Sequence, residues 1–289
     1  MNSKTLIKID SESSSEFQLP SGVLANFVCK AWLSIAEDLH LLHLYHQNTA
    51  QNNVCLVLQG EHSLDCQLHV IDPSNHHHMT ITKRLDPPFE SSMPNFDIAG
   101  SCNGFLCLFD DSQLVPDTIF IYNPFTNESK QLPLTNKNFS NQRVVLGFGF
   151  DPISKEYKVI RIVYCIPPMV SWYIRYETSE ISINTLGTDS WRSLGQAAYW
   201  LDGGTPSTYV NGSLHWLTQC HKFQQYQDIA RFDLATEQFK KVPGPSSKDF
   251  WRHCYSVVEL RGCLCAVVHT NNSDTIEVWI MKDYNVKES

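Results

Sequence analysis

The sequence has no long apolar run, no excess of basic residues and no N-terminal leader pattern. None of its 289 residues fall in a run of the roughly 20 apolar residues that a membrane-spanning helix needs. The first ten residues lack the apolar core of a signal peptide. A formal net charge of −8 argues against a nucleic-acid partner. We therefore expect a cytoplasmic or nuclear protein that binds neither membrane nor nucleic acid and keeps its 10 cysteines reduced.

The sequence also lacks a complete pattern for catalysis or for cofactor binding. Residues 100–104 have the spacing of a nucleophile elbow with Cys102 as the nucleophile, but residues 105–109 read as a strand where that motif needs a helix. Residues 147–149 lack the third glycine of a dinucleotide loop. The three histidines between residues 40 and 46 have no cysteine or acidic partner at metal-ligand spacing. The sequence thus predicts no catalytic residue, no cofactor and no metal site.

What the sequence does contain is a repeated strand unit. The turn dipeptide Asn103-Gly104 precedes an apolar strand at 105–110, a second strand follows at 119–122, and a polar turn leads to a closing segment at 131–133. Copies of this unit begin at Val54, Tyr157, Ser213 and Cys263. The turns recur about every 50 residues, a spacing typical of kelch-type blades. The repeats predict a mainly β fold, an antiparallel β-propeller-like domain.

Aromatic side chains fall both within and between these predicted strands. Those within or beside strands are expected to fill the space between blades, and they are Tyr122, Trp191, Trp216, Phe232 and Trp279. Those in predicted loops are Tyr199, Trp200, Phe223, Tyr226, Phe250 and Trp251. The loop aromatics are candidate anchors for a target protein, and the alternative is that they are half-buried caps on the propeller face.

The N-terminal part carries a different periodicity. Apolar residues from Val23 to Ile35 form one continuous stripe on an α-helix. The segment Val28-Cys29-Lys30-Ala31-Trp32 resembles the end of a plant F-box, and Leu19-Pro20 is similar to the dipeptide that opens that motif. The repeat region resembles the F-box-associated domain. The motifs that carry this resemblance are residues 100–107, 122–126, 147–152, 157–159, 211–216 and 229–233.

One departure from the family concerns the spacing within the F-box. The family has a helical segment between Leu-Pro and Val-Cys-Lys-x-Trp, whereas only residues 21–27 separate them here. We therefore expect a disordered tail at residues 1–18, where serine-rich sequence is prominent, a truncated F-box helical segment at 19–46, and the propeller-like domain at 47–289.

The resemblance implies a non-catalytic subunit that recognises substrates for an SCF-type ubiquitin ligase and binds a target protein through its propeller. It also implies contact with the Skp adaptor, which we expect to be weak or lost in the shortened F-box. The residues that would make this contact are Leu19, Pro20, Val23, Leu24, Phe27, Val28, Cys29 and Trp32. The alternatives are a degenerate binding module that no longer recruits the ligase, and a kelch-like propeller enzyme.

Overall fold

The fold is built entirely from strands and turns in the part of the chain that the structure describes. The computed structural model describes residues 6–10, 54–60, 67–72, 80–89, 93, 95–110, 118–135, 142–165, 178–218, 228–244, 254–269 and 276–286. Within these residues no helix has the length and apolar character needed to cross a membrane. The predicted F-box helix at 19–46 lies outside the described residues.

The strands are grouped in sequence order into sheets. The first sheet contains β1 (Leu6–Asp10), β2 (Val54–Gly60), β3 (Gln67–Asp72) and β4 (Thr80–Leu85). The second contains β5 (Phe96–Cys102), β6 (Phe105–Asp110), β7 (Ile119–Asn123) and β8 (Glu128–Gln131). The third contains β9 (Gln142–Asp151), β10 (Glu156–Cys165), β11 (Thr178–Thr185) and β12 (Arg192–Gly195). The fourth contains β13 (Thr208–Val210), β14 (Ser213–Leu217), β15 (Ile229–Asp233) and β16 (Gln238–Lys241). The last has three described strands, β17 (Cys254–Leu260), β18 (Cys263–His269) and β19 (Ile276–Ile280).

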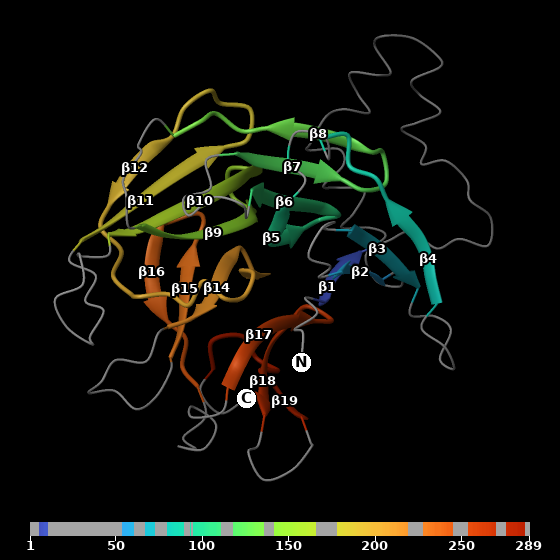
Figure 1. Cartoon of the computed structure of the whole chain (residues 1–289). Helices are drawn as coiled ribbons and strands as arrows, with labels where there is room; N and C mark the ends of the chain where they lie inside the picture. Colours follow the sequence, from blue (N-terminus) through green and yellow to red (C-terminus); the bar gives the residue numbers. More distant parts are fainter. Residues whose placement is uncertain are drawn as a thin grey trace, which may run out of the picture.

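These sheets are arranged as the blades of a β-propeller. Each is an antiparallel meander, and the sheets follow one another around a ring with strands such as β5 and β9 toward the middle and β4, β8 and β12 toward the rim (Figure 1). The predicted mainly antiparallel, propeller-like fold is therefore confirmed.

The turns that the sequence singled out occupy equivalent places in successive blades. Asn103-Gly104 joins β5 to β6 and has φ angles of 48° and 81°, and Asn211-Gly212 joins β13 to β14 with φ angles of 52° and 70°. Arg261-Gly262 does the same between β17 and β18. Positive φ at both central residues is the requirement of a type I′ hairpin turn, which explains the Asn-Gly sequence. The prediction of equivalent hairpin turns is confirmed.

The prediction of a disordered tail at residues 1–18 is wrong for residues 6–10. Leu6–Asp10 lie within the predicted disordered tail, yet they form strand β1, which pairs antiparallel with β2 from Leu6↔Leu58 to Asp10↔Val54. The segment is rich in β-branched and apolar residues, so it can supply a strand when a sheet edge is available. The serine-rich residues that prompted the prediction lie after it in the sequence, outside the described residues.

The hydrophobic cores lie in the seams between neighbouring blades. In β6, Leu106 and Leu108 pack in the core toward the first blade, while Phe105 and Cys107 pack in the core toward the third. Successive strand residues point to opposite faces, so a strand covered on both sides is apolar throughout. This two-sided burial explains why the strands read as continuous apolar runs.

The aromatic residues predicted to fill these seams mostly do so. Tyr122, Trp216 and Phe232 are fully buried, and Trp191 is half-buried with its indole N–H donating to the Pro133 carbonyl at 2.7 Å. The prediction is wrong for Trp279, whose side chain is 40% exposed on β19. No further described strand pairs with β19, and this leaves Trp279 at the edge of its sheet.

The inner strands approach one another closely because small residues line them. The Ser207 hydroxyl donates to the Ala99 carbonyl of β5 at 3.0 Å and accepts from the Phe148 N–H of β9 at 3.3 Å. A Cβ added at Gly100 would lie 2.7 Å from that hydroxyl oxygen. Glycine is therefore required here by the close approach of three blades.

Gly147 on β9 gives a direct test of this close packing. A Cβ at this position would collide with the ring of Trp216, which is fully buried and has no room to move away. We expect Gly147→Ala to lower the free energy of unfolding by about 1–3 kcal/mol, measured by chemical denaturation. The control is Gly204→Ala, whose added Cβ would meet its nearest neighbour at 3.6 Å. Equal stability of the two variants would contradict the steric account.

A buried histidine ties the fourth blade to the segment after β19. His215 is fully buried, and its Nδ1–H donates to the Thr208 carbonyl at 3.1 Å while Nε2 accepts from the Tyr284 hydroxyl at 2.7 Å. Burial, with a smaller contribution from the nearby Arg231, lowers the pKa of His215 to about 4 despite the opposing effect of the Thr208 hydrogen bond. His215 is therefore neutral at physiological pH and serves as a structural link.

Candidate functional site

The two ends of the blades differ in the length of their connections. In the second to fifth sheets, one end, here called the turn end, carries the short turns between the first and second strands and between the third and fourth strands, including Asn103-Gly104 and Asn211-Gly212. The opposite end, here called the loop end, carries the second-to-third strand connections and those between blades. Connections at the loop end include 166–177 and 219–227, which are longer than the turns. Binding sites are commonly built on the longer loops of a rigid scaffold, so the loop end is the first place to search.

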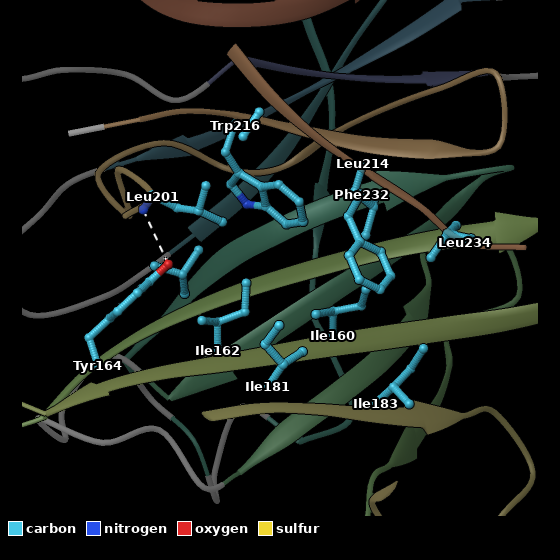
Figure 2. Close-up of a cluster of buried hydrophobic side chains, with 12 residues drawn as sticks. Ile160, Ile162, Tyr164, Ile181, Ile183, Leu201, Leu214, Trp216, Phe232 and Leu234 are labelled. Atoms are coloured by element: carbon cyan, nitrogen blue, oxygen red, sulfur yellow. Dashed lines mark hydrogen bonds between the residues drawn. The ribbon is translucent and has the colours of Figure 1, made fainter. Parts of the chain in front are cut away.

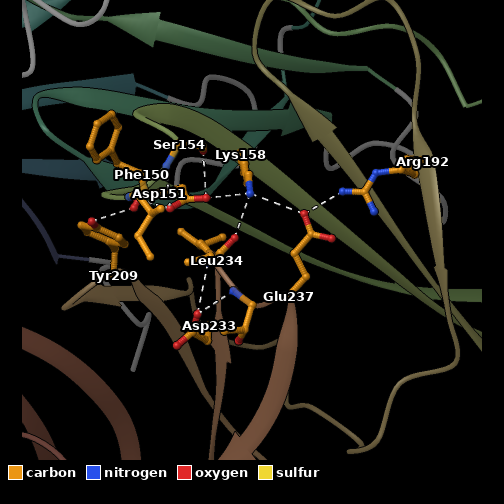
Figure 3. Close-up of polar contacts among 12 residues, drawn as sticks. Phe150, Asp151, Ser154, Lys158, Arg192, Tyr209, Asp233, Leu234 and Glu237 are labelled. Carbon is orange, nitrogen blue, oxygen red and sulfur yellow. Dashed lines mark hydrogen bonds and ion pairs between the residues drawn. The ribbon is translucent and has the colours of Figure 1, made fainter.

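At the turn end, charged residues join the third and fourth blades. The Lys158 ammonium on β10 donates to Asp151 at 2.8 Å and to the Leu234 carbonyl at 2.8 Å, and it lies 3.4 Å from Glu237 (Figure 3). Arg192 on β12 extends the network by pairing with Glu237 at 2.6 Å. Each of these charges contacts an opposite charge, and the Lys158–Glu237 and Arg192–Glu237 pairs cross the seam between the two blades, so we interpret the cluster as a structural clamp.

The acidic members of this clamp are held in their charged forms. Burial disfavours the Asp151 carboxylate, but hydrogen bonds from Lys158, the Ile153 N–H and Ser154 together outweigh it and lower the pKa of Asp151. The hydrogen bond from Arg192 likewise lowers the pKa of Glu237. Neither carboxyl group is therefore tuned to exchange protons near neutral pH.

At the loop end, a cavity of about 420 Å³ opens on one face of the third blade. Gln142, Cys165 and Thr178 line it and lie in one row across β9, β10 and β11, as the pairings Cys165↔Gln142 and Cys165↔Thr178 show. Arg161 lies four residues before Cys165 on the same face of β10 and also lines the cavity. The volume lies within the ~300–1,000 Å³ typical of ligand pockets.

Two polar side chains of this cavity are almost fully buried. Arg161 is 2% exposed and Gln142 is 6% exposed, and Glu180 and Gln196 also contribute to the lining. Neither Oε1 nor Nε2 of Gln142 has a hydrogen-bond partner among the residues that the structure describes. A buried amide in this state is destabilising unless something else satisfies it. The cavity therefore has the chemistry of a binding site for a polar group.

The cavity residues were not singled out from the sequence, although one signal was present. Arg161 interrupts the otherwise apolar run of 159–164, which lies in a strand buried on both faces. A charged residue at the centre of such a strand is rarely fully buried without a specific role. Gln142 gave no comparable signal, because its place at the first residue of β9 depends on the strand boundary.

Two of the predicted loop aromatics fall within the described residues. Tyr199 and Trp200 lie in the β12–β13 connection and are half-buried against the core between the third and fourth blades. The Tyr199 carbonyl accepts from the Tyr164 hydroxyl at 2.8 Å, and the Tyr199 and Phe239 rings are 5.9 Å apart. They lie on the opposite face of the third blade from Arg161, because Tyr164 and Arg161 are an odd number of residues apart on β10.

The other predicted contact residues lie outside the described residues. Phe223 and Tyr226 belong to the β14–β15 connection, and Phe250 and Trp251 to the β16–β17 connection. The predicted adaptor-contact residues also lie outside the described residues, and they are Leu19, Pro20, Val23, Leu24, Phe27, Val28, Cys29 and Trp32. Both sets therefore stay predictions.

The elbow-like residues 100–104 do not have the geometry of a nucleophile site. Residues 105–110 form strand β6, where the motif needs a helix, and Cys102 is 4% exposed. Among the described residues, no three His, Cys, Asp or Glu side chains are placed to hold a metal ion.

Comparison with known proteins agrees with the fold. Residues 53–288 match the model of the F-box associated beta propeller domain. The F-box protein At3g07870 of Arabidopsis thaliana is 38% identical over 288 residues, and the match covers 94% of this chain and 68% of the relative. The F-box/kelch-repeat protein At3g23880 of the same plant is 24% identical, and the match covers 65% of this chain and 50% of the relative.

A further relative and a solved structure also match part of this chain. The match to the F-box/LRR-repeat protein At2g43260 of Arabidopsis thaliana, at 30% identity, covers 65% of this chain and 44% of the relative. Among solved structures, the tricorn protease covers 79% of this chain at 9% identity with a TM-score of 0.38, too low to support an argument. With a family match over 53–288 and a propeller of the expected architecture, the chain belongs to the plant F-box proteins that carry an F-box-associated β-propeller domain.

Proposed function

We propose that this protein is a substrate-recognition subunit of an SCF-type ubiquitin ligase, and that its propeller binds the target protein without catalysis. The observation that carries the proposal is the family match over residues 53–288, together with relatives named as F-box proteins. A recognition subunit needs a rigid scaffold that presents a binding surface, and the blades provide one at the loop end. Its partners would be the Skp adaptor and a target protein, in the cytoplasm or the nucleus.

The charged residues of the described structure are consistent with a binding role. An enzyme on this fold would need ionisable side chains available to a reacting molecule. The clamp of Asp151, Lys158, Arg192 and Glu237 instead satisfies its charges internally. The loop-end cavity offers Arg161 and Gln142, which are suited to hydrogen bonding and charge recognition.

A second candidate is a binding module that no longer recruits the ligase. The observation that favours it is the short distance between Leu19-Pro20 and Val28, which omits a segment of the family pattern. An interface of standard size buries roughly 800 Å² on each partner, and a shortened helical motif offers less.

The two candidates are separated by calorimetric titration of purified Skp adaptor into this chain. We expect weak or undetectable binding, because fewer buried anchors ordinarily give a faster off-rate. A version with the omitted family segment inserted between residues 20 and 28 should bind clearly more tightly. Submicromolar binding by the unmodified chain would contradict the expected weakness and would favour full recruitment of the ligase.

Two matched variants of the chain with the inserted family segment, here called the restored chain, test whether the adaptor binds the F-box-like segment. Trp32→Ala removes a predicted adaptor contact and should weaken the titration, whereas Trp200→Ala changes an aromatic residue of the propeller and should leave it unchanged. If both restored variants bind as the restored parent does, the adaptor does not use the F-box-like segment.

A further inference from the structure

The loop-end cavity is bounded by two deep polar side chains of complementary chemistry. Arg161 presents a cationic guanidinium from β10, and Gln142 presents an amide from β9. Their positions differ by four residues in register, about 13 Å along the strand direction before the side chains extend. A ligand that reaches both must therefore be extended and must carry more than one polar group.

The Gln142 amide points to a partner that both donates and accepts hydrogen bonds. Its Oε1 and Nε2 are both buried, and neither has a partner among the described residues. A peptide group offers an N–H donor and a C=O acceptor, so a polypeptide backbone can satisfy both atoms of the amide. This favours a segment of polypeptide over a simple inorganic ion.

Arg161 adds a preference for negative charge. A guanidinium has five N–H donors, so it can keep a contact within the protein and still donate two parallel bonds to a carboxylate. Arg161 is 2% exposed, and a hydrogen bond to a charged group is stronger in such a buried environment of low dielectric constant.

Glu180 limits how much negative charge the cavity accepts. It lines the same cavity and stands opposite Val163 in the β10–β11 register, two residues along β10 from Arg161. A phosphate group, with a charge of about −1.5 to −2, would be repelled more strongly by this carboxylate than a carboxylate ligand with a single charge. The lining therefore favours an acidic side chain over a phosphorylated one.

We propose that the loop-end cavity binds an extended target segment through an aspartate or glutamate side chain, with Arg161 holding the carboxylate and Gln142 pairing with a peptide group. This inference rests on the proposed function, since it names the class of target that the propeller recognises. Cys165 pairs with Gln142 across β9 and β10 and lines the same cavity. The rate at which its thiol is alkylated therefore measures whether the cavity is occupied, although Cys165 takes no part in recognition.

The test measures how fast iodoacetamide alkylates Cys165 of the purified chain, resolved by mass spectrometry. The probes are three blocked pentapeptides, acetyl-Ala-Ala-X-Ala-Ala-amide, in which X is glutamate, glutamine or phosphoserine. The glutamate peptide should slow alkylation of Cys165 at a concentration about tenfold lower than the other two. Alkylation of Cys263, which is partly exposed on β18 away from the cavity, should not change and serves as the internal control.

Variants assign the effect to the two side chains. Gln142→Met keeps the volume of the side chain and removes an unsatisfied buried amide, so it should fold normally and lose about tenfold in peptide protection. Arg161→Gln should abolish the preference for glutamate over glutamine. The control is Arg143→Gln, since Arg143 pairs with Asp202 at 3.0 Å and points to the opposite face of the blade.

The outcomes separate the inference from the proposed function. Equal protection by all three peptides, no protection at all, or stronger protection by phosphoserine would overturn the inference, and so would unchanged protection in Gln142→Met. If Arg161→Gln fails to fold, Gln142→Met still decides. The adaptor titration uses no peptide, so a failed peptide test leaves recruitment of the ligase to be judged by that titration.

Discussion

Replacing Trp216 with alanine is expected to lower the free energy of unfolding by about 3–5 kcal/mol, measured by chemical denaturation. The indole is 1% exposed and lies in the core between the third and fourth blades. Removing it would leave a cavity that the surrounding strands are too well connected to close.

The surroundings of Trp216 explain why this loss should be large. Figure 2 shows the indole beside Leu201, Leu214 and the isoleucines of β10. Its Nε1–H donates to the Leu146 carbonyl at 3.3 Å, so the side chain also satisfies a group of the neighbouring blade. The absence of a side chain at Gly147 makes room for the ring. One residue therefore joins two blades by packing, by hydrogen bonding and by the fit to a glycine.

A second tryptophan gives a matched control for this prediction. Trp279 is 40% exposed on β19, so Trp279→Ala should change the free energy of unfolding by less than about 1 kcal/mol. If Trp216→Ala costs no more than Trp279→Ala, the indole does not support the seam between the blades.

The sequence predicted the outer three strands of each blade better than the inner one. Strands with alternating or continuous apolar residues after an Asn-Gly turn, such as β6 and β14, were identified with nearly their observed bounds. The inner strands β5 and β9 were missed as strands. They contain Gly100, Gly147 and Gly149, residues of low strand propensity that are needed because neighbouring blades approach too closely for a Cβ.

The candidate site was harder to predict than the fold for a related reason. The cavity lies over neighbouring positions of β9, β10 and β11, so Gln142 and Arg161 line the same cavity only because of the strand register. Their separation in the sequence gives no recognisable motif. Catalytic motifs have fixed spacings, whereas this arrangement depends on which residues of each strand share a face.

The buried ion pair between Lys158 and Asp151 gives the other large expected effect. Lys158→Met is expected to lower the free energy of unfolding at pH 7 by about 3–5 kcal/mol, because it leaves the Asp151 carboxylate buried without its cation. Lys158 and Asp151 side chains are 8% and 3% exposed, and their charged atoms are 2.8 Å apart. Figure 3 shows that the same ammonium also reaches Leu234 and Glu237 on the fourth blade.

An exposed lysine provides the control. Lys241 pairs with Asp228 at 2.7 Å, but its side chain is 53% exposed. Lys241→Met should therefore cost about 0–1 kcal/mol, as expected for a surface ion pair. Similar losses in the two variants would show that the seam between the blades does not depend on the buried charge.

The pH dependence of the two proteins should distinguish loss of charge from loss of packing. In the unmodified protein the pKa of Asp151 is lowered by folding, so its contribution to stability is present above the unfolded pKa of about 3.9 and is lost as the pH falls through the folded pKa. In Lys158→Met, burial without the cation raises the pKa of Asp151, so protonation relieves the buried charge as the pH falls. The difference in unfolding free energy between the two proteins should therefore be largest near neutral pH and should narrow below about pH 4. A difference that stays constant between pH 7 and pH 3 would mean that Lys158 stabilises the seam through its aliphatic stem and not through its charge.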